Sequence, residues 1–352
     1  MLKWLIIAGV LVEVCSLMAV TLSNYWIYGQ LRDGEPVRYD PYAVFITKGW
    51  PRPTANNPAP PDRRHCRTIW LFGGSTMSGA TDDNERTIPS FLAKILNREE
   101  PVSPACLVNF GEPSFNSLME TKYLQKALIE NRPRPDVIIF YDGANDCAYF
   151  AQDRTPYAHY GYRRLQGLVE SYYRSFFGLF KPLNAAWYAC FTRELAGKIR
   201  QGLVPIEQNS PLIRQFVDRA EERYDYVNEL AERFGAKFLL FWQPCWWVET
   251  EPVSAQVRAK EGIIMDKRSA LHHNFLVPYR ALADRLRTKP YFVDFQNILC
   301  SRTEPFYQQD GIHLQDPGRE MVARRMGQVL KERLLRTAAS GAAHGESDWG
   351  PQ

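Results

Sequence analysis

The sequence predicts an α/β fold in which helices cover a parallel β-sheet. Two observations lead to this prediction: short apolar runs rich in β-branched and aromatic residues, and longer segments between them with the apolar period of a helix. The five runs lie at 68–72, 107–110, 137–141, 238–241 and 291–294. Of the 352 residues, 45% are hydrophobic and 23% are charged. These proportions exclude disorder, collagen-like repeats and coiled coil for the bulk of the chain.

The segments between the runs predict helices with recognisable ends. The clearest begins at Ser210-Pro211, where a serine caps the helix and a proline suits its first turn. Apolar residues then recur every three or four positions from Leu212 to Leu230, and Gly235 stands where a helix usually stops. Further helices are expected at about 88–98, 115–131, 274–288 and 317–336.

An apolar run from Leu5 to Leu22 predicts one transmembrane helix ahead of the folded body. Its 18 residues would span about 27 Å as a helix, which suffices for the hydrocarbon core of a bilayer. Glu13 costs roughly 3 kcal/mol on an insertion scale, which ten Leu, Ile and Val residues offset with roughly 3 to 6 kcal/mol. Because no small-residue cleavage site follows, we expect an uncleaved anchor at 1–27 rather than a removed signal peptide.

The rest of the chain divides into a tether, a folded domain and a tail. Residues 28–61 include five prolines between 51 and 61 and are expected to form an extended tether. The folded domain is expected at 62–337, and a disordered tail rich in Ala, Gly and Ser at 338–352. Within the domain, 148–208 interrupts the alternation of strands and helices, and 148–191 holds 13 aromatic residues. We expect this segment to be an inserted cap.

Charge and cysteine content bear on partners and location. A net charge of +4, dispersed along the chain, argues against a nucleic-acid partner, which normally needs a clustered basic face. The orientation of the transmembrane helix is hardly determined by flanking charge, because Lys3 precedes the apolar run and Arg32 and Arg38 follow it. Apart from Cys15 there are six cysteines, an even number that permits disulfides outside the cytoplasm. We therefore expect the folded domain to be extracytoplasmic, in the periplasm.

Polar and glycine residues follow three of the runs and precede the last helix. These segments are Gly-Gly-Ser-Thr at 73–76, Gly-Glu-Pro-Ser at 111–114, Asp-Gly-Ala-Asn-Asp at 142–146 and Asp-Gly-Ile-His at 310–313. In an open α/β sheet ligands bind beyond the carboxyl ends of the strands. The four segments therefore predict one functional site at that edge.

The residue types at this edge are those of nucleophilic catalysis by a serine. Ser75 would be the nucleophile, His313 the base that takes its proton, and Asp310 the acid that fixes the histidine tautomer. The backbone N–H groups of Gly111 and Ser75 and the side-chain amide of Asn145 would stabilise the developing oxyanion. No cofactor and no metal is expected for this chemistry.

The four segments resemble those of the SGNH hydrolases, also called GDSL esterases and lipases. Ser75, Gly111, Asn145 and His313 match the four letters in the family's order, and the resemblance covers about residues 66–335. It implies a flavodoxin-like three-layer sandwich with a five-stranded parallel sheet, and ester chemistry. The first segment departs from the family's Gly-Asp-Ser because Gly74 replaces the aspartate, which we interpret as a subfamily with a Gly-Gly-Ser-Thr first segment.

The implied strand order also predicts a disulfide. Cys66 and Cys106 immediately precede the first two strands, which are neighbours in a flavodoxin-like sheet. Neighbouring strands lie about 4.8 Å apart, within the Cα separation that a disulfide accepts.

The substrate is read from aromatic residues near the site. The fourth run is followed by Trp242, Trp246 and Trp247. We expect these residues to line a groove beside Ser75, since aromatic faces suit sugar rings. The sequence thus predicts a membrane-anchored serine esterase or acyltransferase acting on acyl esters, above all O-acetyl esters, of an exported carbohydrate. A lysophospholipase or thioesterase, and a catalytically silent carbohydrate-binding envelope protein, are the alternatives.

Overall fold

The structure, a computed structural model, describes residues 2–28, 37–47, 51–58, 66–79, 81, 83–99, 104–130, 134–174, 178–188, 190–250, 253–263 and 269–342. Its centre is a sheet of five parallel strands in the order β4-β3-β5-β6-β7. The strands are β3 (Arg67–Gly73), β4 (Ala105–Asn109), β5 (Val137–Asp142), β6 (Lys237–Trp242) and β7 (Phe292–Asp294). Since the second strand of the sheet lies outside the first, the order is flavodoxin-like. The predicted fold class is confirmed.

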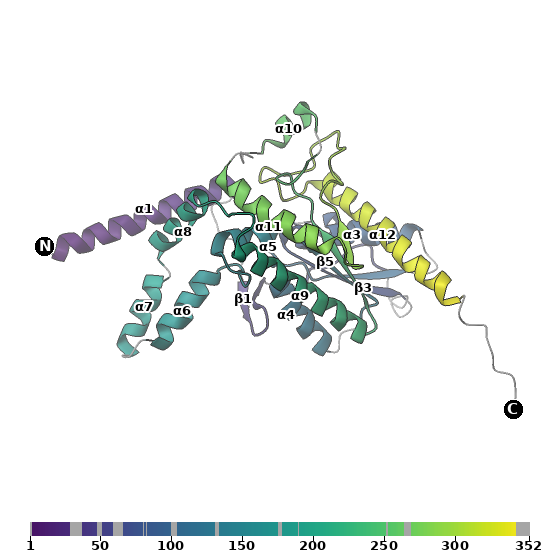
Figure 1. Ribbon diagram of the computed structural model, residues 1–352, viewed down its shortest axis with the longest axis horizontal. Helices are drawn as coiled ribbons and strands as arrows, with labels where there is room; N and C mark the ends of the chain where they lie inside the picture. The colour runs from purple at the N-terminus through teal and green to yellow at the C-terminus, as the bar shows by residue number, and fades with distance from the viewer. Residues whose placement is uncertain are drawn as a thin grey trace.

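Helices cover both faces of the sheet (Figure 1). Along β3, Trp70 and Phe72 pack into one core, and Ile69 and Leu71 into the other, because successive strand residues point to opposite faces. The first core is closed by α4 (Ser117–Ile129), α5 (Ala144–Asp153), α9 (Pro211–Arg233) and α11 (Ala270–Leu286). The second is closed by α3 (Ile88–Glu99) and α12 (Asp316–Ala342).

The best-marked helix ends of the sequence are confirmed. The Ser210 side chain accepts a hydrogen bond from the N–H of Ile213 at the start of α9. Gly235, just beyond the end of α9, has a φ of +78°, which glycine adopts without steric cost. Helix α9 packs against β6, the strand that follows it in the chain.

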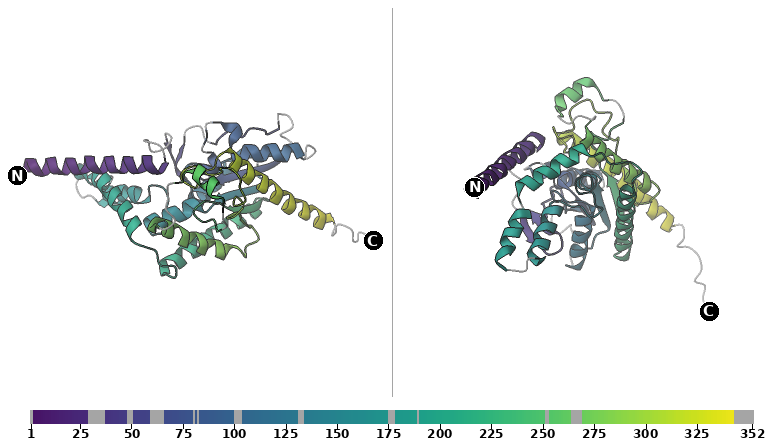
Figure 2. Two further views of the ribbon diagram at one scale, coloured as in Figure 1. Left: turned by 90° about the horizontal axis from the view of Figure 1, so that it is seen from above. Right: turned by 60° about the vertical axis from the view of Figure 1, so that its left-hand side comes forward.

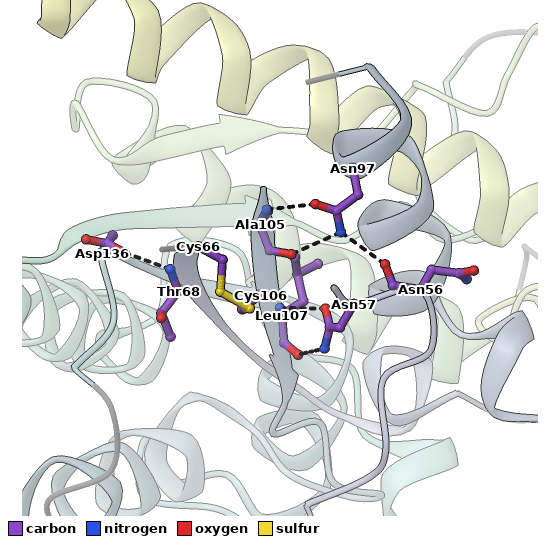
Figure 3. The surroundings of a disulfide bond; sticks show 9 residues. All are labelled: Asn56, Asn57, Cys66, Thr68, Asn97, Ala105, Cys106, Leu107 and Asp136. Carbon is purple, nitrogen blue, oxygen red and sulfur yellow. Dashed lines mark hydrogen bonds between the residues drawn. A yellow bond between two sulfur atoms is a disulfide. The ribbon is translucent and has the colours of Figure 1, made fainter. Parts of the chain in front are cut away.

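The disulfide between Cys66 and Cys106 is present, with a Cα–Cα distance of 5.6 Å (Figure 3). It joins the first two strands of the sheet where they begin. Asn97 binds both backbone groups of Ala105, the residue before Cys106: its side chain accepts from the Ala105 N–H at 2.7 Å and donates to the Ala105 carbonyl at 3.0 Å. The same edge strand is held by Asn57, which makes both backbone hydrogen bonds of Leu107.

The segment expected to be an extended tether contains a β-hairpin. Strands β1 (Val37–Asp40) and β2 (Val44–Thr47) pair antiparallel, and the Asp40 carboxylate accepts from the N–H groups of Tyr42 and Ala43 in the turn between them. Thr47 donates its N–H (2.8 Å) and its hydroxyl (3.0 Å) to the buried carboxylate of Glu112. The hairpin is thereby fixed to the loop after β4. The remaining tether positions 29–36, 48–50 and 59–61 lie outside the described residues.

Helix α1 (Leu2–Tyr28) projects from the body (Figures 1 and 2). Among the described residues it is the one helix long and apolar enough to cross a membrane, over Leu2–Leu22. Between β5 and α9 lie α5, α6 (Tyr162–Arg174), the short 3₁₀ helix η3 (Gly178–Phe180), α7 (Lys181–Tyr188) and α8 (Phe191–Leu203). At the other end α12 continues to Ala342, past the start expected for the tail at 338, and 343–352 lie outside the described residues.

Candidate active site

The carboxyl ends of the strands bring the predicted site residues together. Ser75 begins the short helix α2 (Ser75–Ser78), which starts directly after β3. Asn145 lies in the first turn of α5, directly after β5, and His313 precedes α12. Ser75 Oγ lies 2.6 Å from Nε2 of His313, although the two residues are 238 positions apart in the chain.

Asp310 and His313 form one rigid turn. One carboxylate oxygen of Asp310 accepts hydrogen bonds from the backbone N–H groups of Ile312 (2.8 Å) and His313 (2.9 Å). The other contacts Nδ1 of His313. Between them Gly311 has a φ of +72°, which a residue with a side chain rarely adopts. With Nδ1–H held by the carboxylate, Nε2 is free to accept the proton of Ser75.

The electrostatics of the turn keep Asp310 ionised. Burial alone would raise the pKa of this carboxyl, but its hydrogen bond and charge interaction with His313 and its two backbone N–H donors outweigh burial and hold the pKa below its usual range. The side chain of His313 is 21% exposed and that of Asp310 is 10% exposed. The carboxylate is therefore available to stabilise a protonated imidazole in a site that still opens to solvent.

Gly74, the departure from the usual first segment, packs directly on Asn145. A Cβ at position 74 would lie 2.3 Å from Nδ2 of Asn145 and 3.1 Å from the Phe115 carbonyl oxygen. The same Nδ2 donates to that carbonyl at 2.6 Å, which fixes the orientation of the amide. The amide thus occupies space that an aspartate at 74 would need. Gly74 is a structural requirement of this arrangement.

The expectation for Gly111 is wrong. Its N–H is donated to Oδ1 of Asn109 at 2.9 Å, so it is not available to an oxyanion. A Cβ there would lie 2.3 Å from the backbone nitrogen of Ser78, so glycine is needed for close packing of the loop on α2. Three residues on, Ser114 has a φ of +66°, and no hydrogen bond within the described residues uses its N–H. The positive φ of Ser114 has no signature in the sequence, because it occurs in a residue other than glycine.

Three buried carboxyl groups lie around the turn that carries Asn145, and the sequence did not single them out. Asp142 and Asp146 flank this turn, and Glu120 of α4 is buried beside them. Burial raises the pKa of all three, and repulsion from Asp142 raises that of Glu120 further. Asp146 accepts a hydrogen bond of 2.5 Å from the Ser117 hydroxyl. This hydrogen bond connects the turn that carries Asn145 to the first residue of α4.

The three tryptophans do not share one environment. Trp242 is fully buried, beside Gly143 and against Tyr279, so the expectation that it lines a groove is wrong. Trp246 and Trp247 are partly exposed and lie against the turn of Asp310 and His313: the backbone N–H of Trp246 donates to the Gly311 carbonyl at 2.8 Å. A Cβ on Gly311 would lie 2.9 Å from Nε1 of Trp247.

No protein-family model matches the chain, and a search of curated proteins found no match. Among solved structures the chain is similar to a lipase/acylhydrolase from Enterococcus faecalis, with 17% identity over 76% of this chain and 96% of that chain and a TM-score of 0.38. An esterase from Pseudoalteromonas is 12% identical over 76% and 98% of the two chains, with a TM-score of 0.40. An acetyl xylan esterase is 14% identical over 75% and 99%, with a TM-score of 0.39. At such TM-scores the assignment of function depends on the side-chain geometry of the site.

Proposed function

We propose that the protein is a serine ester hydrolase or acyltransferase of the SGNH type. The observation that carries the proposal is the chain of contacts from Asp310 through His313 to Ser75, with Ser75 Oγ 2.6 Å from Nε2. A serine hydroxyl is a weak nucleophile until a base within hydrogen-bond reach takes its proton, and that base needs a partner to orient it. The domain at 62–337 would carry this activity.

The reaction runs in two halves. Ser75 Oγ attacks the ester carbonyl carbon while His313 Nε2 takes the hydroxyl proton, and the carbonyl electron pair moves to the oxygen. When the tetrahedral intermediate collapses, the bond to the leaving alcohol breaks and His313 gives that alcohol its proton. Water, or an acceptor hydroxyl in the transfer reaction, then attacks the acyl-serine with His313 again as base, and Ser75 is regenerated.

The oxyanion would be held by Asn145 and two backbone groups. The Phe115 carbonyl takes one hydrogen of the Asn145 amide and leaves the other for the substrate. Ser75 is the first residue of α2, where a backbone N–H has no partner within the helix. For the third donor we propose the N–H of Ser114 in place of that of Gly111, because no hydrogen bond within the described residues uses the former and Asn109 accepts the latter.

For the substrate we propose an acyl ester, in the first place an O-acetyl ester, of an exported carbohydrate. Its support is the pair Trp246 and Trp247, whose partly exposed side chains border the turn of Asp310 and His313. A lipid ester, as for a lysophospholipase or thioesterase, is the second candidate. It is favoured by the exposed apolar side chains of α6, α7 and α8.

The proposed location is supported by α1 and by the disulfide. Helix α1 would anchor the enzyme in a membrane, since its apolar stretch is long enough to cross one. The bond between Cys66 and Cys106 belongs to an oxidising compartment, which favours a periplasmic catalytic domain.

Labelling with a fluorophosphonate tests the proposal, because only an activated serine reacts with this probe. Full-length protein is expected to take up one label, lost in Ser75→Ala and in His313→Ala. The matched control is Ser301→Ala, which removes an exposed hydroxyl elsewhere and should label like the wild type. Absence of label on the wild type would favour the catalytically silent binding protein, and label retained in Ser75→Ala would refute the assignment of the nucleophile.

A further inference from the structure

Exposed large apolar side chains are concentrated in one region of the body. Outside α1, the described part of the chain exposes 16 of them, and ten fall between 157 and 204. They are Tyr157, Tyr160, Val169, Tyr172, Tyr173, Phe180, Leu183, Trp187, Ile199 and Val204. Soluble proteins rarely expose such a concentration unless the surface meets a partner or a membrane.

These residues centre on α6, η3, α7 and α8, on the side of the molecule from which α1 projects (Figures 1 and 2). Helix α7 has no buried residue, and within it Leu183 is 64% exposed and Trp187 is 67% exposed. Helix α6 packs against α7, and α8 packs along α1. Helix α8, which follows α7 in the chain, therefore connects this exposed apolar region to the candidate membrane span.

The contact between α1 and α8 is polar and lies deep in the apolar stretch. The Glu13 carboxylate accepts from the N–H of Phe191 (2.6 Å), the N–H of Thr192 (3.1 Å) and the Thr192 hydroxyl (2.7 Å). The Ser16 hydroxyl lies 3.2 Å from the same hydroxyl. A carboxylate at a helix N-terminus satisfies orphan donors and meets the positive end of the helix dipole.

The position of Glu13 along α1 indicates how deep in a membrane the N-terminus of α8 would lie. Glu13 lies nine residues before Leu22, the end of the candidate span, which is about 14 Å along a helix. In a hydrocarbon core about 30 Å thick, that is close to the middle. Ionisable side chains at such depth are expensive and almost always paired. A partner in α8 explains why the apolar run tolerates Glu13.

We propose that α6, η3, α7 and α8 form a second membrane-contacting element, which enters one leaflet beside α1 and contacts its lipids through Phe180, Leu183 and Trp187. This inference rests on the proposed anchoring by α1. One cation–aromatic pair suits the headgroup level of that leaflet: Lys181 Nζ lies 4.4 Å from the ring centre of Tyr172. The element holds the catalytic domain down on the bilayer, beyond what a single flexible anchor would do.

Fluorescence quenching by brominated lipid tests this contact. Full-length protein is placed in phosphatidylcholine vesicles with or without bromine on the acyl chains, and each tryptophan is isolated as the difference between wild type and a Trp→Phe variant. Trp187→Phe is the test, Trp4→Phe reports on α1, and Trp70→Phe is the buried control, since Trp70 is 1% exposed in the body. The Trp187 difference emission should lose more than half its intensity in brominated vesicles and resist aqueous iodide.

The outcomes separate this inference from the proposed function. Quenching of Trp4 without quenching of Trp187, or quenching of Trp187 by iodide instead, overturns the second contact and leaves the anchored enzyme intact. Quenching of neither residue overturns the contact together with the anchor. The measurement needs no catalytic activity, so a failure of the ester chemistry at Ser75 would not affect it.

Discussion

Gly74 offers the sharpest perturbation of the proposed oxyanion hole. In Gly74→Ala the new Cβ would lie 2.3 Å from Nδ2 of Asn145, whereas ordinary van der Waals contact begins at 3.4 Å. The amide must therefore move by 3.4 − 2.3, about 1.1 Å. It would also lose its 2.6 Å hydrogen bond to the Phe115 carbonyl. The substitution acts on the proposed oxyanion donor Asn145 and leaves Ser75 and His313 unchanged.

A displacement of about 1 Å at a catalytic group costs on the order of 10²-fold in rate, and removal of an oxyanion donor about 10²- to 10³-fold. We therefore expect Gly74→Ala to lower kcat/KM for a small aryl acetate about 10²-fold, or about 2.7 kcal/mol of transition-state stabilisation. The loss should appear mainly in kcat, because the oxyanion exists only in the transition state and intermediates.

The decisive comparison is a double-mutant cycle with Asn145→Ala. If Gly74→Ala acts through the amide, the double variant should be about as active as Asn145→Ala alone. Gly197→Ala is the matched control, since a Cβ at Gly197 would have nothing within 4 Å. Full activity of Gly74→Ala, or an equal further loss in the Asn145→Ala background, would refute the reasoning.

Three further predictions concern the catalytic turn, the buried carboxyls and the disulfide. Asp310→Asn should lower kcat by about 10³- to 10⁴-fold with an unchanged circular dichroism spectrum, because the wrong His313 tautomer is favoured; near wild-type turnover would contradict this. The raised pKa of Glu120 means that its contribution to stability is complete below its ordinary pKa of 4.5 and is lost as pH rises through the folded-state pKa. Denaturant unfolding of Glu120→Gln between pH 5 and 8 should therefore show a shallower loss of stability than the wild type, which falls by up to about 1.4 kcal/mol per pH unit for each proton retained; equal slopes would argue against the raised pKa. The disulfide closes a separation of 40 residues, so the double substitution of Cys66 and Cys106 by Ser should lower the free energy of unfolding by about 4 kcal/mol, and an unchanged thermal midpoint would show that the bond does not form.

The sheet and the core of the site were predictable because their signals are local. The strands are recognisable in the sequence as short apolar runs. Ser75, Asn145 and His313 lie just after a run or before a helix. The pairing of Cys66 with Cys106 followed from the strand order that the resemblance implied. The strands and the site residues thus needed only the sequence pattern and the rule that ligands meet the carboxyl ends of parallel strands, whereas the disulfide also needed the strand order.

The sequence failed to predict features that depend on packing and hydrogen bonding within the folded chain. Strand β6 extends to residue 242, so Trp242 falls in phase with Phe238 and Leu240 and is buried with them on the α9 face. Gly111 was assigned from its position, but a side chain two residues earlier captures its N–H. The contact of Glu13 with α8 joins residues 178 and 179 positions apart, beyond any local signal.

The central claim is that Ser75 carries the acyl group after activation by His313. The most direct measurement is to mix the full-length protein with an aryl acetate, quench with acid at early times, and map the acetylated peptide by mass spectrometry. The account predicts one acetyl group per chain, on Ser75, that accumulates before steady state and is absent from Ser75→Ala and His313→Ala. An acetyl group on another residue, or turnover of the ester by Ser75→Ala at the wild-type rate, would contradict it.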